Sequence, residues 1–192
     1  MAAGGVAIFP ADTVYGLACD AGDEGAVDRL YVLKGRPQDK PAAVMFFSLE
    51  LALGSVGRQG PRIIAALEAL LPGAVTLLIP NGELRYPLAC ASDPETLGLR
   101  VPALPPAAAS LHAVRWPVLQ SSANAAGGRD PREIGEVPPQ IVERADLVID
   151  AGPLPGTPST VVDLRGFEQD GSWAILRQGA LSADEIGIAL ER

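Results

Sequence analysis

The chain alternates between short apolar runs and segments whose apolar residues recur at helical spacing. The run at residues 6–9, which Pro10 ends, is typical of a buried strand. Residues 24–33 instead place their apolar side chains on one stripe, as an amphipathic helix does. The same criteria predict further strands at 41–47, 75–79, 97–101, 118–120, 147–149, 160–164 and 173–176. Further helices are predicted at 62–71, 107–114, 138–144 and 183–190.

The alternation of strands with helices indicates an α/β fold, with a sheet that helices cover over at least part of both faces. The strand at 147–149 is expected to be buried, and Ser182 and Glu185 form a capping box for the last helix. The 192 residues contain no internal repeat and no stretch resembling a linker. We therefore expect a single domain over residues 1–192.

The charge and the cysteine content of the chain argue against several classes of protein. The net charge of −8 disfavours non-specific binding to nucleic acid, which needs a cationic surface. Two isolated cysteines, Cys19 and Cys90, support neither a disulfide framework nor a zinc site, and indicate a reducing, cytoplasmic setting. No signal peptide or membrane-spanning run is evident. The sole histidine, His112, is expected in a surface or packing role, which disfavours mechanisms that need a Ser-His or Cys-His pair.

A cationic cluster interrupts this acidic chain at residues 34–41. Lys34, Arg36 and Lys40 lie within seven residues, and glycine and proline shape the backbone between them. The planar fork of arginine suits phosphate, and the lysines act as point charges. This segment alone leaves two explanations open. It is either a phosphate site or a solvated loop whose lysines stabilise the end of the preceding helix.

Polar residues also follow several predicted strands, where open α/β sheets place their ligands. They lie at residues 12–16, 121–124 and 156–163, and at Arg177. The small hydroxyl residues of 121–124 would form a cradle for phosphate, unless they make an ordinary turn. Thr13 would offer a hydroxyl and Tyr15 an aromatic wall, unless Asp12 and Thr13 only cap a turn and Tyr15 packs in the core.

Two of these residues have simpler expected roles. Asp163 is expected to orient a neighbouring side chain, and Arg177 either binds the ligand or makes a structural ion pair. The chain has no GxxxxGK[ST] or GxGxxG motif, no paired carboxylates at useful spacing and no metal-ligand cluster. A cavity of cations, hydroxyls and turns suits a reaction in which binding and alignment dominate, such as nucleotidyl transfer.

Seven segments, in this order, resemble the YrdC family, the threonylcarbamoyl-adenylate synthases of tRNA modification. They are FPADTVYGL (9–17), KGRPQDKPAAV (34–44), LPGAVTLL (71–78), LGLRVP (97–102), SSANAAGG (121–128), STVVDL (159–164) and ILRQGA (175–180). The resemblance implies the short, single-domain form, with a twisted open mixed sheet and a deep concave cavity. It also implies a reaction of L-threonine, bicarbonate and ATP that yields threonylcarbamoyl-AMP and pyrophosphate, with Mg²⁺ expected beside ATP. A partner protein complex would then pass the threonylcarbamoyl group to tRNA.

The resemblance also implies roles for individual residues. Carried over by motif, the threonine contacts are Thr13, Arg100, Ser159 and the backbone of Gln120. The ATP contacts are Arg36, Lys40, Thr96, Ser122 and Arg177, while Lys34 and Asn124 line the phosphate region. We expect Lys34 and Arg36 to act in catalysis by alignment and charge neutralisation, and replacing either with Ala to abolish adenylate formation while leaving the fold intact.

Three positions depart from the family pattern. Met45 stands where many relatives have a histidine near threonine, and it would pack on the threonine methyl group. Asp130 stands where a serine often meets ATP, and it adds a carboxylate near the expected phosphates. Ala11 replaces a common threonine. Alternative hypotheses are a paralogue of the YciO type, an enzyme that handles a carbamoyl-adenylate with another acceptor, and an RNA-binding module with weak affinity for tRNA.

Overall fold

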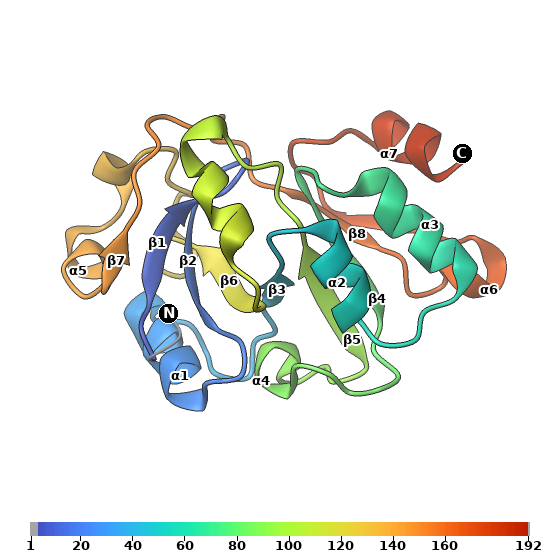
Figure 1. Cartoon of the computed structure of the whole chain (residues 1–192), viewed down its shortest axis with the longest axis horizontal. Coiled ribbons are helices and arrows are strands. Elements are labelled where there is room, and N and C mark those ends of the chain that lie inside the picture. The colour runs from blue at the N-terminus through green and yellow to red at the C-terminus, as the bar shows by residue number, and fades with distance from the viewer. Residues whose placement is uncertain (1–3, 192) are drawn as a thin grey trace.

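In the computed structural model, the described residues 4–191 form an open, mixed, nine-stranded sheet (Figure 1). The strand order is β7-β1-β2-β6-β3-β5-β4-β8-β9, and the β1–β7, β3–β5 and β4–β8 pairs are parallel. The strands are β1 Ala7–Pro10, β2 Tyr15–Asp20, β3 Ala43–Met45, β4 Val75–Pro80, β5 Thr96–Arg100, β6 Val118–Ser122, β7 Leu147–Val148, β8 Thr160–Asp163 and β9 Ala174–Arg177. The α-helices are α1 Glu24–Lys34, α2 Leu49–Ser55, α3 Pro61–Leu70, α4 Pro87–Cys90, α5 Pro139–Val142, α6 Phe167–Asp170 and α7 Ala183–Leu190. Two 3-10 helices, η1 Pro106–Ala113 and η2 Ile134–Glu136, complete the elements.

The sheet separates two apolar clusters. The larger one contains residues of α1, α3, α5 and α7 and one set of side chains from the central strands, including Leu77, Leu99 and Leu119. Successive side chains of a strand point to opposite faces, so Leu78 and Arg100 lie on the other face. There η1 covers a smaller cluster, and the rest of that face remains open. The predicted mixed α/β sheet with helical cover on parts of both faces is therefore confirmed.

The end of α1 explains how the cationic cluster is displayed. Asp23 caps the start of the helix by accepting a hydrogen bond from Ala26 N at 3.0 Å. Gly35 ends it in the left-handed region at φ 59°, which glycine adopts without steric penalty. The N–H of Arg36 then closes on the carbonyl of Tyr31 at 2.9 Å. Lys34 and Arg36 consequently lie on either side of one tight turn.

Several sequence-based boundaries differ from the structure. Strand β2 was not predicted, because both of its faces are buried and its sequence YGLACD shows no clear alternation. Residues 106–113 form a 3-10 helix instead of an α-helix. The strand at 147–149 is not buried: β7 is the edge of the sheet, with Leu147 48% and Val148 37% exposed. The capping box of Ser182 and Glu185 is confirmed.

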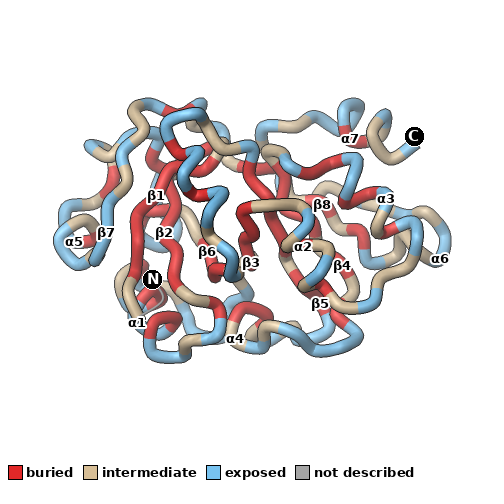
Figure 2. Tube along the Cα trace, viewed as in Figure 1, coloured by how far each residue is buried: buried red, intermediate tan, exposed pale blue. Residues whose placement is uncertain are grey.

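Burial increases from the edges of the sheet to its centre. Figure 2 shows buried central strands and exposed turns, helix surfaces and edge strand β7.

Across the described part of the chain, no helix is both long enough and apolar enough to cross a membrane. His112 is exposed, and its Nδ1 lies 2.9 Å from the carbonyl oxygen of Phe47, a contact between η1 and the segment after β3 that agrees with the expected surface or packing role.

Candidate functional site

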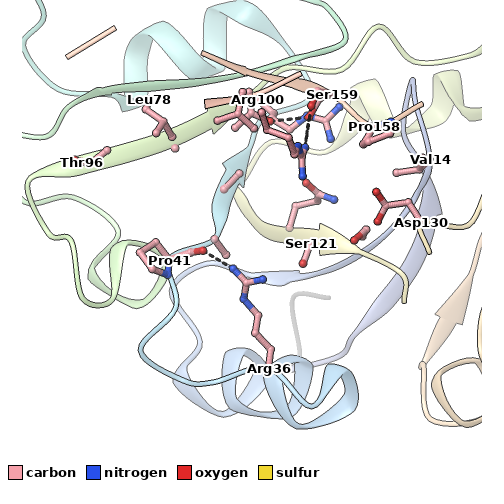
Figure 3. Close-up of a pocket in the computed structure, with 18 of the residues that line it drawn as sticks. Val14, Arg36, Pro41, Leu78, Thr96, Arg100, Ser121, Asp130, Pro158 and Ser159 are labelled. Atoms are coloured by element: carbon pink, nitrogen blue, oxygen red, sulfur yellow. Dashed lines mark hydrogen bonds between the residues drawn. The ribbon is translucent and has the colours of Figure 1, made fainter. Parts of the chain in front are cut away.

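A cavity of about 400 Å³ occupies the open face of the sheet (Figure 3). Side chains from β4, β5, β6, β8 and β9 and from the loop after α1 line it. They include Arg36, Pro41, Thr76, Leu78, Asp93, Thr96, Arg100, Gln120, Ser121, Ser122, Asp130, Ser159 and Arg177. In Figure 3, Arg100 and Ser159 lie together at one side of the cavity and Arg36 lies at the opposite side. The sequence segments that follow separate strands thus meet around one space, as predicted.

A buried ion pair defines one end of the cavity. Arg100 Nη2 donates to Asp12 Oδ1 at 2.7 Å, and the two side chains are only 4% and 5% exposed. Burial lowers the pKa of the Arg100 guanidinium from its usual value, whereas the charge of Asp12 raises it. The Thr13 hydroxyl lies 3.4 Å from Arg100 Nη2; Thr13 is buried, and of these three residues Arg100 is the one that lines the cavity. We call this part, formed by Asp12, Thr13 and Arg100, the arginine end.

Ser159 and Arg177 continue the wall beside the arginine end. Ser159 Oγ lies 2.9 Å from Thr76 Oγ1, and Arg177 Nη2 donates to the Ser159 carbonyl at 2.9 Å. Gly179 makes this packing feasible, because a Cβ there would lie 2.3 Å from the Pro158 carbonyl oxygen. Within the described residues Arg177 makes no ion pair; it donates to Ser159 and lines the cavity.

An adjoining recess of about 250 Å³ lies at the opposite end. We call it the cationic recess; it is lined by Lys34, Arg36, Lys40, Ser122, Asn124 and Asp130, with Arg177 between it and the main cavity. Arg36 Nη2 donates to the Pro41 carbonyl at 2.5 Å, and its guanidinium lies 5.6 Å from the centre of the Tyr31 ring. Lys40 is exposed at the rim. The recess therefore offers cationic groups to an anionic ligand.

Lys34 is less free than its sequence position suggests. Its side chain is buried, and Nζ donates to the Ser122 carbonyl, to the Asn124 carbonyl at 2.8 Å and to Asn124 Oδ1 at 2.9 Å. These acceptors use all three N–H groups of the ammonium. Burial and the charge of Arg36 lower the pKa of Lys34 to about 8, while Asp130 opposes that shift. Lys34 thus holds the loop at 121–130 in place through hydrogen bonds to Ser122 and Asn124.

The same loop is bound by its own side chains. Ser122 Oγ donates to Asn124 Oδ1 at 2.7 Å, and Asn124 Nδ2 donates to the Gly128 carbonyl at 2.5 Å and to Asp130 Oδ1 at 3.3 Å. These bonds orient Ser122 and Asp130 toward the recess, which both line. The predicted cradle is therefore an ordered loop, and its order depends on the buried amine of Lys34.

Thr96 lies on the remaining wall, opposite Asp130 in Figure 3. Its hydroxyl accepts from Arg165 Nη1 at 3.3 Å, and Asp163 holds Arg165 through two hydrogen bonds of 2.6 and 2.9 Å. The prediction that Asp163 orients a neighbouring side chain is confirmed. Gln120, 6% exposed, lies on β6 with its side chain on the cavity.

Two candidate site residues from the sequence do not line the cavity, and for Tyr15 the structure supports the alternative of packing in the core. Met45 is fully buried in the smaller apolar cluster with Phe9 and Leu111, and does not line the cavity. It shares a face with Arg100, its register partner in β5, but η1 covers it there. Tyr15 is also fully buried, with its hydroxyl 2.9 Å from the carboxylate of Asp150, so it is no cavity wall.

Sequence reasoning also missed several residues of the site. Asp12 had been assigned at most to a turn, although it stands next to Thr13, and nothing local indicates that its partner lies 88 positions away. Asp93 lines the cavity, and no sequence signal indicated it, whereas Ser121, which also lines it, belongs to the predicted cradle. Among residues 4–191, no group of three or more His, Cys, Asp or Glu side chains is arranged to hold a metal ion.

The sheet and its cavity define an α/β protein with a buried arginine–carboxylate pair at one end of the cavity and a cationic recess at the other. The family model Sua5_yciO_yrdC, described as Telomere recombination, matches residues 1–179. The chain belongs to this Sua5/YciO/YrdC family.

Curated relatives carry a consistent name. The threonylcarbamoyl-AMP synthase of Pyrococcus abyssi is 32% identical over 185 residues, which are 95% of this chain and 53% of the relative. The putative threonylcarbamoyl-AMP synthase of Mycobacterium tuberculosis is 33% identical over 190 residues, with 98% and 84% covered. The chain thus spans about half the length of the first relative and most of the second.

Solved structures support the fold. The structure of P. abyssi Sua5 complexed with L-threonine has a TM-score of 0.83 and 30% identity, covering 97% of this chain and 54% of that one. E. coli YciO has a TM-score of 0.79 at 24% identity, covering 96% and 88%. The second likeness concerns the fold alone. The predicted family and fold are therefore confirmed.

Proposed function

We propose that this chain is an L-threonylcarbamoyl-AMP synthase that uses L-threonine, bicarbonate and ATP. The observation that carries the proposal is one cavity with a fixed guanidinium at one end and a cationic recess at the other. The names of the relatives and the threonine complex of P. abyssi Sua5 support it. A nucleotidyl transfer from ATP, which releases pyrophosphate, is a reaction that uses both ends of the cavity.

The arginine end suits the carboxylate of an amino acid. The guanidinium of Arg100 provides charge-assisted donors to it, and the Thr13 hydroxyl lies 3.4 Å from that guanidinium. The Ser159 hydroxyl, which accepts from Arg177 Nη2 at 3.3 Å, lies on the adjoining wall, and both hydroxyl groups would contact the polar groups of threonine. The cationic recess suits a triphosphate. Arg36, Lys40 and Arg177 would neutralise its oxygens, and Ser122 would donate a hydroxyl.

The chemistry follows from this alignment. The neutral amine of threonine attacks bicarbonate and loses water to give a carbamate. A carbamate oxygen then attacks the α-phosphorus, and the bond to the bridging oxygen breaks as pyrophosphate leaves with the electron pair. The residues of the two ends would hold the reactants in line and neutralise the leaving group. We propose no general base: of the carboxylates that line the cavity, Asp130 also lines the recess and lies apart from Arg100 in Figure 3, and Asp93 lies 3.9 Å from Arg165.

Magnesium fits the recess as a companion of ATP. Mg²⁺ is commonly held by one or two carboxylates together with substrate phosphates, and Asp130 is the carboxylate that lines both the cavity and the recess. When bound, the ion would supply charge neutralisation on the phosphate oxygens. Delivery of the product to a tRNA-modifying partner complex is part of the same proposal.

The test is product formation from ATP, Mg²⁺, ¹⁴C-bicarbonate and L-threonine, with L-serine and no amino acid as controls. Pyrophosphate release that depends on threonine, together with a labelled adenylate, is the expected result. Nucleotide binding without such a product would contradict the proposal and favour an enzyme of the YciO type with another acceptor. Affinity for tRNA that falls steeply with salt, in the absence of turnover, would favour the RNA-binding alternative.

A further inference from the structure

Arg100 is held by a carboxylate whose sequence context indicated only a turn. Asp12 Oδ1 accepts from Arg100 Nη2 at 2.7 Å, and Asp12 Oδ2 accepts from the backbone N–H of Ala103 at 3.1 Å. Because both oxygens are bound, the carboxylate cannot rotate away from the guanidinium. The orientation of Arg100 is therefore set by Asp12.

The pairing leaves part of the guanidinium available. Asp12 and Thr13 contact Nη2 of Arg100. Within residues 4–191, Nε of Arg100 is buried and has no hydrogen-bond partner, and the side chain lines the cavity. Because Nε is shielded, the donor open to a bound ligand is Nη1, which makes no hydrogen bond with the described residues.

The two ends of the cavity differ in net charge. At the arginine end, the charges of Asp12 and Arg100 cancel. In the recess, Arg36 and Lys34 donate to carbonyl and amide oxygens, which carry no charge, and Asp130 is the carboxylate that lines it. The recess thus retains positive charge, whereas Asp12 and Arg100 together carry none. Arg177, whose charge lowers the pKa of Arg100, lines both the main cavity and the recess and is the cation that the two share.

We propose that Asp12 is a specificity-determining residue: it fits the arginine end to the singly charged carboxylate of the amino acid and keeps phosphate groups out of it. It does so by fixing the guanidinium of Arg100 and cancelling its charge. This inference rests on the proposed function, because it assumes that the amino acid and ATP share the cavity.

The physical reason is the charge of the competing anion. A phosphate or pyrophosphate carries two or more negative charges, and an unneutralised buried arginine would attract it strongly in a medium of low polarity. A nearby carboxylate repels the multiply charged anion more than the singly charged one. Asp12 thereby gives ATP one orientation, with its phosphates in the recess.

The experiment compares the wild type with Asp12→Asn, which keeps the shape and removes the charge. We expect the KM for threonine to rise about ten-fold, because a charge-assisted bond that orients Arg100 is lost. We also expect inorganic phosphate and pyrophosphate to become competitive inhibitors against threonine, about ten-fold tighter than in the wild type. The KM for ATP should change little, since the recess is untouched.

Two further variants separate charge from structure. Asp12→Glu keeps the charge but moves it, so it should retain the exclusion of phosphate while weakening threonine binding. Asp146→Asn is the control outside the cavity, because Asp146, although 48% exposed, likewise accepts from an arginine, Arg29, and from a backbone N–H, that of Val6. It lies at the α1–β7 corner, away from the cavity residues, and should leave both kinetic readouts unchanged.

The outcomes separate this inference from the proposed function. If the wild type releases pyrophosphate with threonine, and folded Asp12→Asn shows neither a higher KM for threonine nor new competition by phosphate, this inference alone is overturned. If Asp12→Asn does not fold, loss of phosphate exclusion in folded Asp12→Glu overturns it equally. A wild type without threonine-dependent product overturns both.

Discussion

The two ends of the cavity use their cations in opposite ways. Arg100 has a protein carboxylate as its partner and is buried, so its position is fixed before any ligand arrives. Among the described residues Arg36 donates a hydrogen bond only to the Pro41 carbonyl and stacks over the Tyr31 ring, so it has no carboxylate partner, and Lys40 is exposed. Preorganisation at one end and available charge at the other suit a small, singly charged substrate and a large polyanion, respectively.

The comparison also shows that not every basic residue of the cluster has donors free to bind a ligand. Lys34 stands two positions from Arg36, yet its ammonium is saturated by the loop it supports. Its contribution is to position Ser122 and Asn124. Direct contact between Lys34 and phosphate requires the exchange of one of these bonds.

The largest expected effect comes from breaking the arginine end. Arg100→Ala should reduce threonine-dependent turnover by at least about 100-fold and lower the free energy of unfolding by about 3–5 kcal/mol, because Asp12 remains buried without a cation. The double variant Asp12→Asn with Arg100→Met should regain most of the stability and none of the activity. Thermal unfolding and pyrophosphate release measure the two effects. A single variant as stable as the wild type would show that the pair is not a buried ion pair in solution.

The next comparison lies within the recess. Arg36→Ala should raise the KM for ATP about 10- to 100-fold and change stability by less than about 1 kcal/mol. Lys34→Ala should weaken ATP binding and also lower the free energy of unfolding by about 2–4 kcal/mol, because buried acceptors on Ser122 and Asn124 lose their donor. The sequence-based expectation of an intact fold for both variants is therefore revised for Lys34. Equal melting temperatures of the two variants would contradict the prediction that Lys34 stabilises the fold whereas Arg36 serves mainly to bind ATP.

A smaller effect follows from the pKa of Lys34. ATP affinity of the protein without threonine should fall as the pH rises through about 8, because the neutral amine loses its charge and one donor. Stability changes in the opposite direction: the unfolded chain binds more protons between the folded pKa of about 8 and the usual 10.5, so unfolding becomes harder across that window.

Calorimetric titration of ATP from pH 7 to about 9.5 tests this dependence, a range chosen to bracket the lowered pKa. Lys40→Ala should bind ATP more weakly and keep the decline, whereas Lys34→Met should lose it. An affinity in the wild type that stays constant through this range would mean that Lys34 does not titrate there.

The smallest effect is expected at Met45. Because η1 and the smaller apolar cluster cover this side chain, Met45→Leu should change the KM for threonine by less than about two-fold and the free energy of unfolding by less than about 1.5 kcal/mol. Steady-state kinetics with threonine and with serine provide the measurement. A shift in the preference between the two amino acids would show that Met45 does reach the substrate.

Much of the fold was predictable because its elements carry local signals. The apolar run at 6–9, the helical stripe at 24–33 and the capping box at Ser182 each depend on residues close in the chain. Strand β2 and the exposure of β7 were not predictable, because each depends on the neighbouring strands in the sheet. The residues of a strand do not themselves indicate whether it lies at the centre or at the edge of the sheet.

The sequence by itself determined the family, the α/β architecture and the chemical inventory of the site. Turns, caps and motifs are short-range features, and the seven segments lie in one recognisable order. Only the tertiary structure decided how that inventory is used. It paired Arg100 with Asp12, committed Lys34 to the loop at 121–130, and covered Met45. Each of these outcomes depends on contacts between residues that are far apart in the chain. Such contacts determine how deeply a charged side chain is buried, and burial determines how strongly that charge interacts with its neighbours.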